Sequence, residues 1–216
     1  MDRFPDTASA EETRGLIVEE AMRLFAHYGY SKTNISDIAR ACGMSAGNLY
    51  RYFRNKQAIG IAVVARFFDA VDRCVAEQTD PAASAEARIR FVITESVMHT
   101  VRELRQAPKI VELSEMICEI EDGMAFIAGH TERCRARLEL LVAEGVAAGE
   151  FRVDDPARAA RALQMGTKFF RLPFAIARHG LDRIEDDLAL ALDLLCAGLR
   201  EGGGKAAHGG GSVRRP

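Results

Sequence analysis

The sequence contains no tryptophan, few tyrosines and no closely spaced pair of cysteines. Its five cysteines are an odd number scattered along the chain, which argues against a disulfide framework and for thiols in a reducing cytoplasm. The longest clean apolar run, residues 58–65, ends at Arg66 and is far shorter than the ~20 residues of a membrane-spanning helix. Residues 1–10 are polar, lack the pattern of a secretory signal and are expected to be disordered. We therefore predict a cytoplasmic protein that does not enter a membrane.

Patterns typical of β-sheet are also scarce, because apolar and polar residues show little strict alternation. Leucine, alanine, glutamate and arginine instead recur at helical spacing, and the 48% of hydrophobic residues is ample for a core. These features predict an all-α protein. The nucleotide-binding G-x-G-x-x-G and P-loop motifs and the zinc-protease motif H-E-x-x-H do not occur, so neither an enzyme nor a cofactor is predicted.

Residues 33–56 are the most informative stretch, because they indicate two short helices around a glycine turn. Gly43 suits that turn, since glycine adopts backbone conformations that other residues resist. Ser45 is placed to cap the second helix, whose buried side carries Leu49 and Phe53. The first helix has one apolar face, formed at three- and four-residue intervals by Ile35, Ile38, Ala39 and Cys42.

The outward face of the second helix suits contact with the major groove of DNA. Small residues at its start let the helix approach base edges, and amide, phenol and guanidinium groups follow. These residues are Ala46, Gly47, Asn48, Arg51 and Tyr52. Between residues 31 and 56 there are five basic residues and one acidic residue, a net charge of +4, whereas the whole chain carries −2. A basic patch on a slightly acidic protein predicts one DNA-facing surface.

This stretch and the helix before it carry a longer pattern whose order and spacing are specific. Its residues are Ala21, Leu24, Phe25, Gly29, Tyr30, Thr33, Ile38, Ala39, Gly43, Ser45, Gly47, Leu49, Tyr50, Tyr52, Phe53 and Lys56. Over residues 12–60 the pattern resembles the TetR (tetracycline-repressor-like) family of transcriptional regulators, and beyond them only helical character and length agree. The resemblance implies an N-terminal three-helix, helix-turn-helix domain followed by a C-terminal helical domain that binds a ligand and dimerises.

The resemblance also assigns contacts to individual residues. Thr33, Tyr50, Tyr52 and Lys56 are expected to contact phosphates, and Ser36, Ala46, Gly47 and Asn48 are expected to face the bases. From the residues alone, both tyrosines could equally be half-buried packing residues. Ala46 and Gly47 offer little beyond their backbone, so discrimination would depend on Asn48. Because one short helix contacts few bases, we expect a homodimer on a palindromic double-stranded DNA operator.

Capping and proline signals predict the remaining helices. Asn55 is placed to cap a long helix over residues 56–78, and Asp80 with Pro81 can begin the next helix. Asp182 and Glu185 resemble a capping box for the last helix. The other expected helices cover residues 12–28 with Gly29 as a left-handed cap, a segment from 109 with bends at Gly123 and Gly129, a helix from Thr131 to near Gly149, and one from Pro156 that Pro173 bends or ends.

The expected domains are a disordered segment over residues 1–10, a DNA-binding domain over 11–56, a connecting helix over 57–80, an effector-binding and dimerisation domain over 81–200 and a flexible tail over 201–216. By resemblance, the last two long helices form the dimer interface, and a small-molecule effector binds in the domain over 81–200. Its candidate lining residues are Met98, His99, Met116, Phe126, Met165, Phe169 and Phe170. Ordinary core packing is the commoner role for any one of them.

We therefore expect a repressor that an effector releases from its operator. His130 and Cys134 could share a helix face, but without a third and fourth ligand no metal site is predicted. The Cys42 thiol could make DNA binding sensitive to oxidation or could simply be buried. A thiol- or metal-responsive regulator on the same scaffold is the second hypothesis, and a helical enzyme or adaptor without DNA binding is the third. Operator binding separates the third from the others, and sensitivity to oxidant or chelator separates the second from the first.

Overall fold

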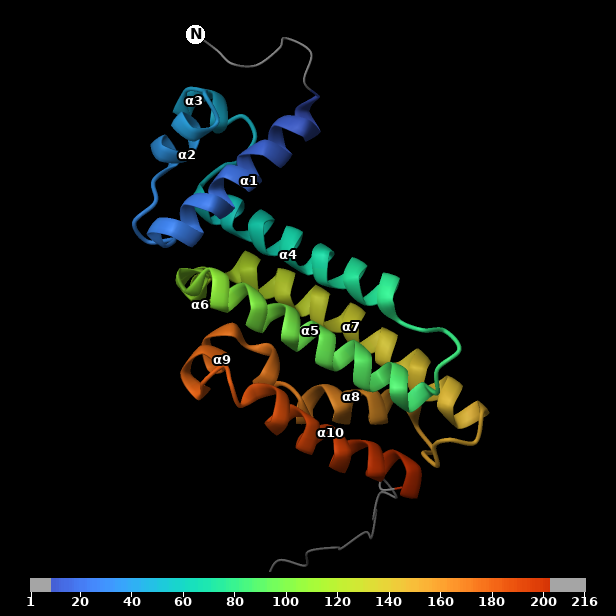
Figure 1. The fold of residues 1–216 in the computed structure, drawn as a ribbon. Coiled ribbons are helices and arrows are strands. Elements are labelled where there is room, and N and C mark those ends of the chain that lie inside the picture. The colour runs from blue at the N-terminus through green and yellow to red at the C-terminus, as the bar shows by residue number, and fades with distance from the viewer. Residues whose placement is uncertain (1–8, 203–216) are drawn as a thin grey trace, which may run out of the picture.

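A computed structural model describes residues 9–202, and within this range the chain is built from helices and contains no strand. The all-α prediction is confirmed. Figure 1 shows a small N-terminal head from which α4 runs to pack beside α5 and α7, while α8 and α10 lie on the side of the bundle away from α4. The elements are α1 (Ala10–Tyr28), α2 (Ile35–Ala41), α3 (Ala46–Leu49), α4 (Lys56–Gln78), α5 (Ala85–Gln106), the 3-10 helix η1 (Pro108–Ile110), α6 (Val111–Glu119), α7 (Glu121–Ala147), α8 (Pro156–Gly166), the 3-10 helix η2 (Phe169–Arg171), α9 (Pro173–His179) and α10 (Ile184–Glu201).

The first helix begins slightly earlier than expected, because Ser9 and Glu12 form a capping box. The Ser9 hydroxyl accepts the Glu12 backbone N–H at 3.1 Å, and the Glu12 carboxylate accepts the Ser9 N–H at 2.7 Å. Gly29 ends the helix at φ 91° and ψ 155°, so φ is positive but the expected left-handed helical cap was wrong. Residues 1–8 and 203–216, which hold most of the expected disordered N-terminus and flexible tail, lie outside the described residues.

The start of α4 is confirmed, and the expected start of α5 is wrong. The Asn55 side chain accepts the Ala58 backbone N–H at 2.8 Å and caps α4. Asp80 instead accepts the Ala82 N–H at 2.8 Å in a short turn, and Ser84 caps α5 by accepting the Ala87 N–H at 3.1 Å. Within residues 9–202 no helix combines the length and apolar character needed to cross a membrane.

Helix α7 corrects the expectation of bends at two glycines and of a helix start at Thr131. The chain breaks at Ile120, and α7 then runs unbroken through Gly123, Gly129 and Thr131. A Cβ atom on Gly123 would lie 2.3 Å from the Ile117 carbonyl oxygen, so this glycine permits close approach of the chain before it. Spacing alone could not distinguish a glycine that bends a helix from one that allows close packing.

The C-terminal helices differ from the expected ones in two places. Asp155 caps α8 as the Asp–Pro signal indicates, but α8 ends at Gly166, and Pro173 begins α9 rather than ending a helix. The capping box expected at the start of α10 does not form. Asp182 instead accepts a hydrogen bond from Arg105 at 2.9 Å, and the first residue of α10 is Ile184.

Two hydrophobic cores are present, and α6 connects them. The N-terminal core gathers buried residues of α1 to α4, including Phe25, Ile38 and Leu49, together with Leu113 and Ile117 of α6. The C-terminal core gathers buried residues of α4, α5, α7, α8, η2, α9 and α10. Because α6 packs into the N-terminal core, the packing boundary does not coincide with the expected sequence boundary near residue 80.

Candidate nucleic-acid interface

The turn between α2 and α3 is set by local residues. Gly43 adopts φ 69°, in the left-handed region that favours glycine, and the Met44 N–H then donates to the Ala39 carbonyl at 2.9 Å. Ser45 caps α3 by accepting the Asn48 backbone N–H at 3.1 Å. This geometry confirms the predicted helix–turn–helix over these residues, although α3 ends at Leu49 and the chain continues in turns.

Helix α1 supports this unit from behind. The Leu49 side chain is fully buried in the N-terminal core, and Phe53 is 3% exposed. The Arg14 guanidinium lies 4.3 Å from the centre of the Phe53 ring and donates to the Tyr52 backbone carbonyl. Arg14, which was not predicted from the sequence, therefore contacts and supports the turn that follows α3.

Of the four residues expected to face bases, Ser36 lies on α2 and the other three lie on α3. Ser36 and Gly47 are exposed, and Ala46 and Asn48 are half-buried. A Cβ atom on Gly47 would meet only the Ser45 hydroxyl oxygen, at 3.9 Å. Nothing in this part of the chain therefore requires glycine at position 47, which fits a position where DNA approaches closely. Their role in base contact stays a prediction.

The four expected phosphate contacts fall into two kinds. Tyr50 is 52% exposed, and Tyr52 is half-buried against the N-terminal core. Thr33 is 2% exposed, and its hydroxyl donates to the Gly29 carbonyl at 2.8 Å. A phosphate contact through the Thr33 hydroxyl would require that internal hydrogen bond to open.

The Lys56 ammonium makes its contacts within the protein. Its ammonium donates to the backbone carbonyls of Tyr30 at 2.9 Å and Thr33 at 3.0 Å, and it lies 4.2 Å from the centre of the Tyr30 ring. Burial lowers the pKa of Lys56, and the Glu112 carboxylate opposes that shift. Two of the three ammonium donors thus fix the loop before α2 to the start of α4, which leaves one donor for a phosphate.

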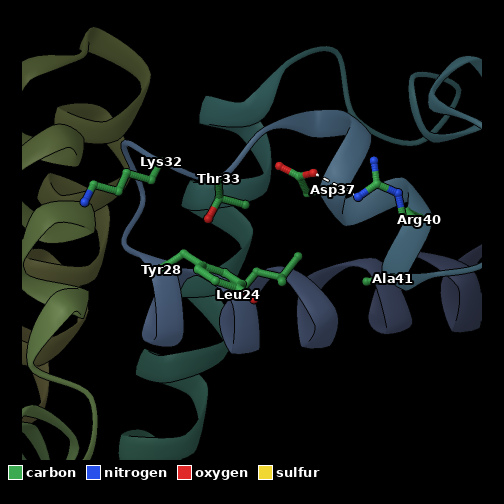
Figure 2. A pocket seen from close by; sticks show the side chains of 7 residues that line it. All are labelled: Leu24, Tyr28, Lys32, Thr33, Asp37, Arg40 and Ala41. Carbon is green, nitrogen blue, oxygen red and sulfur yellow. Dashed lines mark hydrogen bonds and ion pairs between the residues drawn. The ribbon is translucent and has the colours of Figure 1, made fainter.

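A groove of about 400 Å³ lies beside this unit, between the end of α1 and α2 (Figure 2). Lys32 and Arg40 contribute its cations, and Asp37 pairs with Arg40 at 3.4 Å. Both basic residues are exposed, and neither was predicted as a contact residue; they were counted only in the local net charge. The groove therefore adds positive charge next to α2 and broadens the basic surface beyond the expected contact residues.

The structure favours neither a catalytic serine at position 45 nor a reactive thiol at position 42. Gly43, Ser45 and Gly47 match the G-x-S-x-G spacing of many hydrolases, but that motif needs a strand before the serine, and here helix α2 precedes it. Burial, and next the Glu20 charge, raise the pKa of the Cys42 thiol to about 11, and the residue is 4% exposed. Ser45 is therefore a helix cap, and Cys42 is a protonated core residue.

Comparison with known proteins decides what this unit is. Residues 17–63 match the family model for bacterial regulatory proteins of the tetR family, and residues 85–190 match the model for the tetracyclin repressor-like C-terminal domain. The chain belongs to the TetR family. It is therefore a DNA-binding transcriptional regulator with an N-terminal helix-turn-helix.

Individual relatives agree with this assignment. The fatty acid metabolism regulator protein of Bacillus subtilis (strain 168) is 27% identical over 165 residues, which cover 70% of this chain and 77% of that protein. A TetR/AcrR-family regulator from Thermobifida fusca YX-ER1 has a TM-score of 0.65 at 22% identity, covering 87% of this chain and 98% of that one. AibR in complex with isovaleryl coenzyme A and operator DNA has a TM-score of 0.56 at 21% identity, covering 83% and 97%. These solved structures share the fold of this TetR-family protein.

The residues expected to line an effector pocket are distributed over several environments. Met98 packs against the C-terminal core, Phe170 is buried within it, and Met116 packs against the N-terminal core. Met165 and Phe169 are 50% and 44% exposed. The remaining two, His99 and Phe126, lie against Phe67 and Phe68 of α4. The seven residues therefore lie in different environments, and their role in an effector pocket stays a prediction.

An aromatic group lies between α4 and α7, and of its members only Phe126 was predicted to contact an effector. The His130 and Phe126 rings both stack on Phe68, with centroid separations of 3.8 Å and 5.9 Å. His130 is 8% exposed, its Nε2 lies 3.4 Å from the Cys134 sulfur, and its Nδ1 has no hydrogen-bond partner among the described residues. Burial chiefly lowers the pKa of His130 to about 4, so the imidazole is neutral at physiological pH. The spacing of His130 and Cys134 was visible in the sequence, but the stacking was not.

Helix α6 is tied directly to the DNA-binding unit. The Glu112 carboxylate of α6 accepts the Ser31 backbone N–H at 3.0 Å, and in η1, just before α6, the Lys109 ammonium donates to the His27 carbonyl at 2.6 Å. A Cβ atom on Gly29 would lie 2.5 Å from a Glu112 carboxylate oxygen, so glycine is needed for this approach as well as for its φ of +91°. These contacts join α6 and η1 to the end of α1 and the loop that precedes α2.

Proposed function

We propose that this TetR-family protein is a homodimeric repressor that binds a palindromic operator and leaves it when a small effector binds. The observation that carries the proposal is the match of residues 17–63 to the tetR family model, on a helix-turn-helix whose α3 includes the exposed Gly47 and the half-buried Asn48. Such a unit reads too few base pairs alone, so two copies related by a two-fold axis are needed for useful specificity. A bacterial operator would place the protein's action in the cytoplasm.

The DNA contacts are tested by two substitutions with different expected results. Tyr50→Ala removes an exposed phenol expected to contact phosphate, so binding should weaken for all DNA sequences alike. Asn48→Ala removes an amide expected to read a base edge, so discrimination between operator variants should fall by about 1–3 kcal/mol for each base pair concerned. Fluorescence anisotropy with the protein's own promoter fragments measures both. Unchanged binding by the Tyr50 variant would contradict this arrangement.

The proposed dimer interface is the surface of α8 and α10. Leu190 and Leu194 lie four residues apart on α10 and are 64% and 78% exposed, so α10 carries an exposed apolar stripe. Figure 1 shows α10 itself on the side of the bundle away from α4. A Cβ atom on Gly166 of α8 would lie 2.9 Å from a Leu195 methyl group, so the two helices pack closely. A second copy of the same pair would bury the stripe in a four-helix arrangement.

Sedimentation of a double variant tests the dimer. Leu190→Glu with Leu194→Glu introduces charge on both stripe positions and should convert a dimer to monomers with an unchanged helical circular dichroism spectrum. Leu140→Glu is the matched control, because Leu140 is equally exposed, at 65%, but lies on α7. A wild-type monomer at micromolar concentration, or a double variant that stays dimeric, would contradict the proposed interface.

The proposed effector site is the aromatic group of Phe68, Phe126 and His130. A buried polar atom without a partner, such as His130 Nδ1, is uncommon in native structures, and a ligand oxygen would satisfy it. The flat apolar rings beside it suit an acyl chain. Two relatives point to the same chemistry, because one is named a fatty acid metabolism regulator and one was solved with isovaleryl coenzyme A. We therefore assign the effector to fatty acids or their thioesters.

Operator release in the presence of such compounds tests the effector class. A coupling of about 1–3 kcal/mol would weaken operator affinity about 5–150-fold. His130→Phe keeps a flat ring against Phe68 but removes the polar contact, so it should keep DNA binding and lose most of the response. His99→Phe is the control, because His99 faces Phe67 and Cys74 instead. An effector that binds without changing operator affinity would contradict the mechanism.

A further inference from the structure

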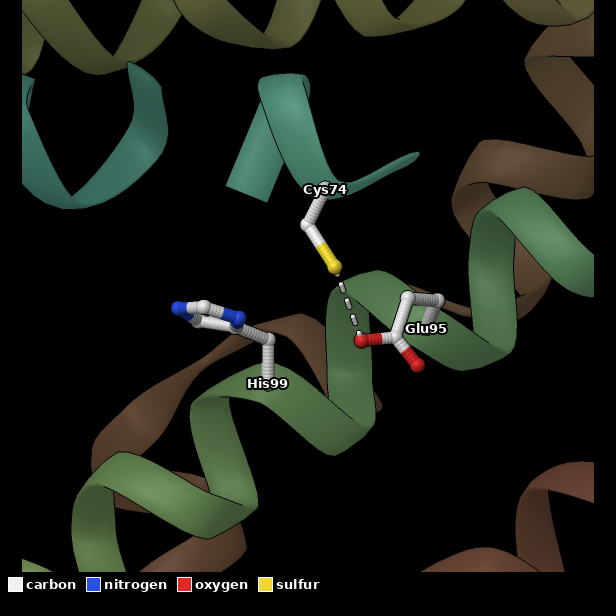
Figure 3. Close-up of side chains that lie close together, drawn as sticks. All are labelled: Cys74, Glu95 and His99. Carbon is white, nitrogen blue, oxygen red and sulfur yellow. Dashed lines mark hydrogen bonds between the residues drawn. The ribbon is translucent and has the colours of Figure 1, made fainter. Parts of the chain in front are cut away.

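A second cluster of chemically versatile side chains lies between α4 and α5 (Figure 3). Cys74 projects from α4, and Glu95 and His99 project from α5, where their four-residue spacing places them on one face. One ligand atom from each residue lies within 4.8 Å of the others, and the Cys74 sulfur is 3.4 Å from a Glu95 carboxylate oxygen.

The three donors match the preferences of zinc. Zinc binds thiolate sulfur at about 2.3 Å and imidazole nitrogen or carboxylate oxygen at about 2.0–2.2 Å, so neighbouring donors of a tetrahedral site lie about 3.5 Å apart. The Cys74–Glu95 separation of 3.4 Å already fits, and the others must shorten by no more than about 1.3 Å, which side-chain rotation can supply. All three residues are half-buried, so an ion can reach them from solvent.

Neighbouring residues position these donors. The Gln78 amide donates to the Cys74 sulfur at 3.0 Å, and the His99 ring packs against Phe67 at 5.4 Å between centroids. Arg102 pairs with the same Glu95 oxygen that faces Cys74, and its side chain is 49% exposed. An ion would compete with this guanidinium for Glu95, and the exposed arginine side chain can move into solvent.

We propose that Cys74, Glu95 and His99 form a binding site for a divalent transition-metal ion of the zinc type, with water as the fourth ligand. On binding, the Cys74 thiol loses its proton to solvent and the ion takes the place of that proton. The site joins α4, which begins immediately after the DNA-binding unit, to α5 of the effector domain. It is independent of the effector proposed at His130 and needs neither DNA nor an effector to be tested.

Titration of the full-length, chelator-treated protein with Zn²⁺ and Co²⁺ tests the site. One ion per chain is expected, and bound Co²⁺ should show a thiolate charge-transfer absorption. Since loss of an outer partner alone costs about 10–100-fold in metal affinity, Cys74→Ser, Glu95→Gln and His99→Gln should each weaken Zn²⁺ binding by about 100-fold. Arg102→Gln removes a competing cation and should tighten binding by about tenfold.

Two control variants test whether other thiols and imidazoles bind the ion. Cys118→Ser changes an exposed cysteine, and the pair His130→Ala with Cys134→Ser removes the other close sulfur–imidazole contact. Zn²⁺ affinity and the cobalt spectrum should survive both changes, with circular dichroism confirming that each variant is folded. Wild-type protein that does not bind Zn²⁺, folded Cys74 and His99 variants that bind it normally, or binding lost in the His130 and Cys134 pair would each overturn the proposal.

Discussion

The Thr33 side chain of the DNA-binding unit and the His130 side chain of the C-terminal helical domain are both buried, but they differ in their hydrogen bonding. In the DNA-binding unit, Tyr50 and Arg51 are exposed, and buried polar groups such as the Thr33 hydroxyl are paired within the head. In the C-terminal domain, His130 is buried, stacked on an aromatic ring and left with one unpaired nitrogen. The first arrangement leaves charge and hydrogen-bonding groups at the surface, and the second leaves an unpaired polar atom inside the fold.

Two glycines also differ between these regions. Gly47 in α3 has nothing within ordinary contact distance of a Cβ atom except the Ser45 hydroxyl at 3.9 Å. Gly145 in α7 has the Phe151 ring, where a Cβ atom would lie 2.2 Å from the nearest ring carbon. Small size at Gly145 is required by packing inside the domain, whereas no packing contact requires it at Gly47. The predicted role of Gly47 in DNA contact can therefore be tested separately from the stability of the fold.

The largest expected effect is the salt dependence of operator binding. With a log–log slope of about −4 to −7 for the dimer, raising salt from about 50 to 200 mM should weaken binding about 10²–10⁴-fold. Arg51→Gln should make the slope shallower by about one per contact, because an exposed guanidinium beside α3 is expected to displace a counterion. Fluorescence anisotropy across a salt series provides the measurement.

Arg133→Gln is the control for this effect, because Arg133 is an exposed arginine on α7 in the effector domain. Its slope should equal that of the wild type. Equal slopes for all three proteins would remove Arg51 from the interface, and a wild-type slope near zero would contradict the whole DNA-facing surface.

The next largest expected effect is a pH dependence of folding stability caused by the buried His130. The His130 pKa is about 4 in the folded protein, chiefly because burial disfavours the charged ring, and its ordinary value is 6.5. The unfolded chain therefore binds the proton first as pH falls, so His130 adds no pH dependence above about 6.5 and lowers stability progressively between 6.5 and 4. The loss amounts to about 3 kcal/mol at the lower end.

Urea denaturation of the wild type and the His130→Phe variant at several pH values measures this difference. The variant should unfold with nearly the same free energy above pH 7 and should lose about 3 kcal/mol less than the wild type by pH 4. Parallel pH curves would show that the ring is protonated or exposed in the folded state, which would also weaken its assignment to an effector.

Replacing Gly145 and Gly47 with alanine should separate an effect on stability from an effect on operator affinity. Gly145→Ala forces Phe151 to shift and should destabilise the fold by about 1–3 kcal/mol, with operator affinity of the folded protein unchanged. Gly47→Ala should keep or raise stability by up to about 1 kcal/mol, because alanine is the better helix former, while operator affinity falls. Urea denaturation and operator binding of both variants decide the matter, and a stable Gly47 variant with normal DNA binding would show that position 47 is not near the bases.

Local signals account for what the sequence predicts well. The Gly43 turn and the Ser45 and Asn55 caps each depend on residues within four positions, so the pattern of residue types is enough to place them. The same reasoning fails where packing against a neighbouring element decides the role. Gly123 was expected to bend a helix, yet it lies in an unbroken α7, where it leaves room for the backbone of Ile117 in α6.

The candidate sites depend still more on distant contacts. Lys56 was expected to contact phosphate, but its ammonium bonds to carbonyls that lie 23 and 26 residues earlier in the chain. Cys74 approaches Glu95 only because α4 packs beside α5, and His130 meets Phe68 only because α7 does the same. Spacing within one helix reveals which residues share a face, but the partner of that face comes from the packing of helices.

The smallest expected effect concerns the link between the two regions. Glu112→Gln removes the negative charge that accepts the Ser31 N–H and that lies near Lys56, while keeping the shape of the side chain. Operator affinity without effector should change little, but the effector-induced change should shrink by about 0.5–2 kcal/mol, because α6 then holds the loop before α2 less firmly. Glu115→Gln is the control, because Glu115 lies on the same helix but pairs with Arg178. Operator titrations with and without a saturating acyl effector compare the variants, and an equal loss of response in both would mean that α6 acts through its packing alone and that the Glu112 contact transmits nothing.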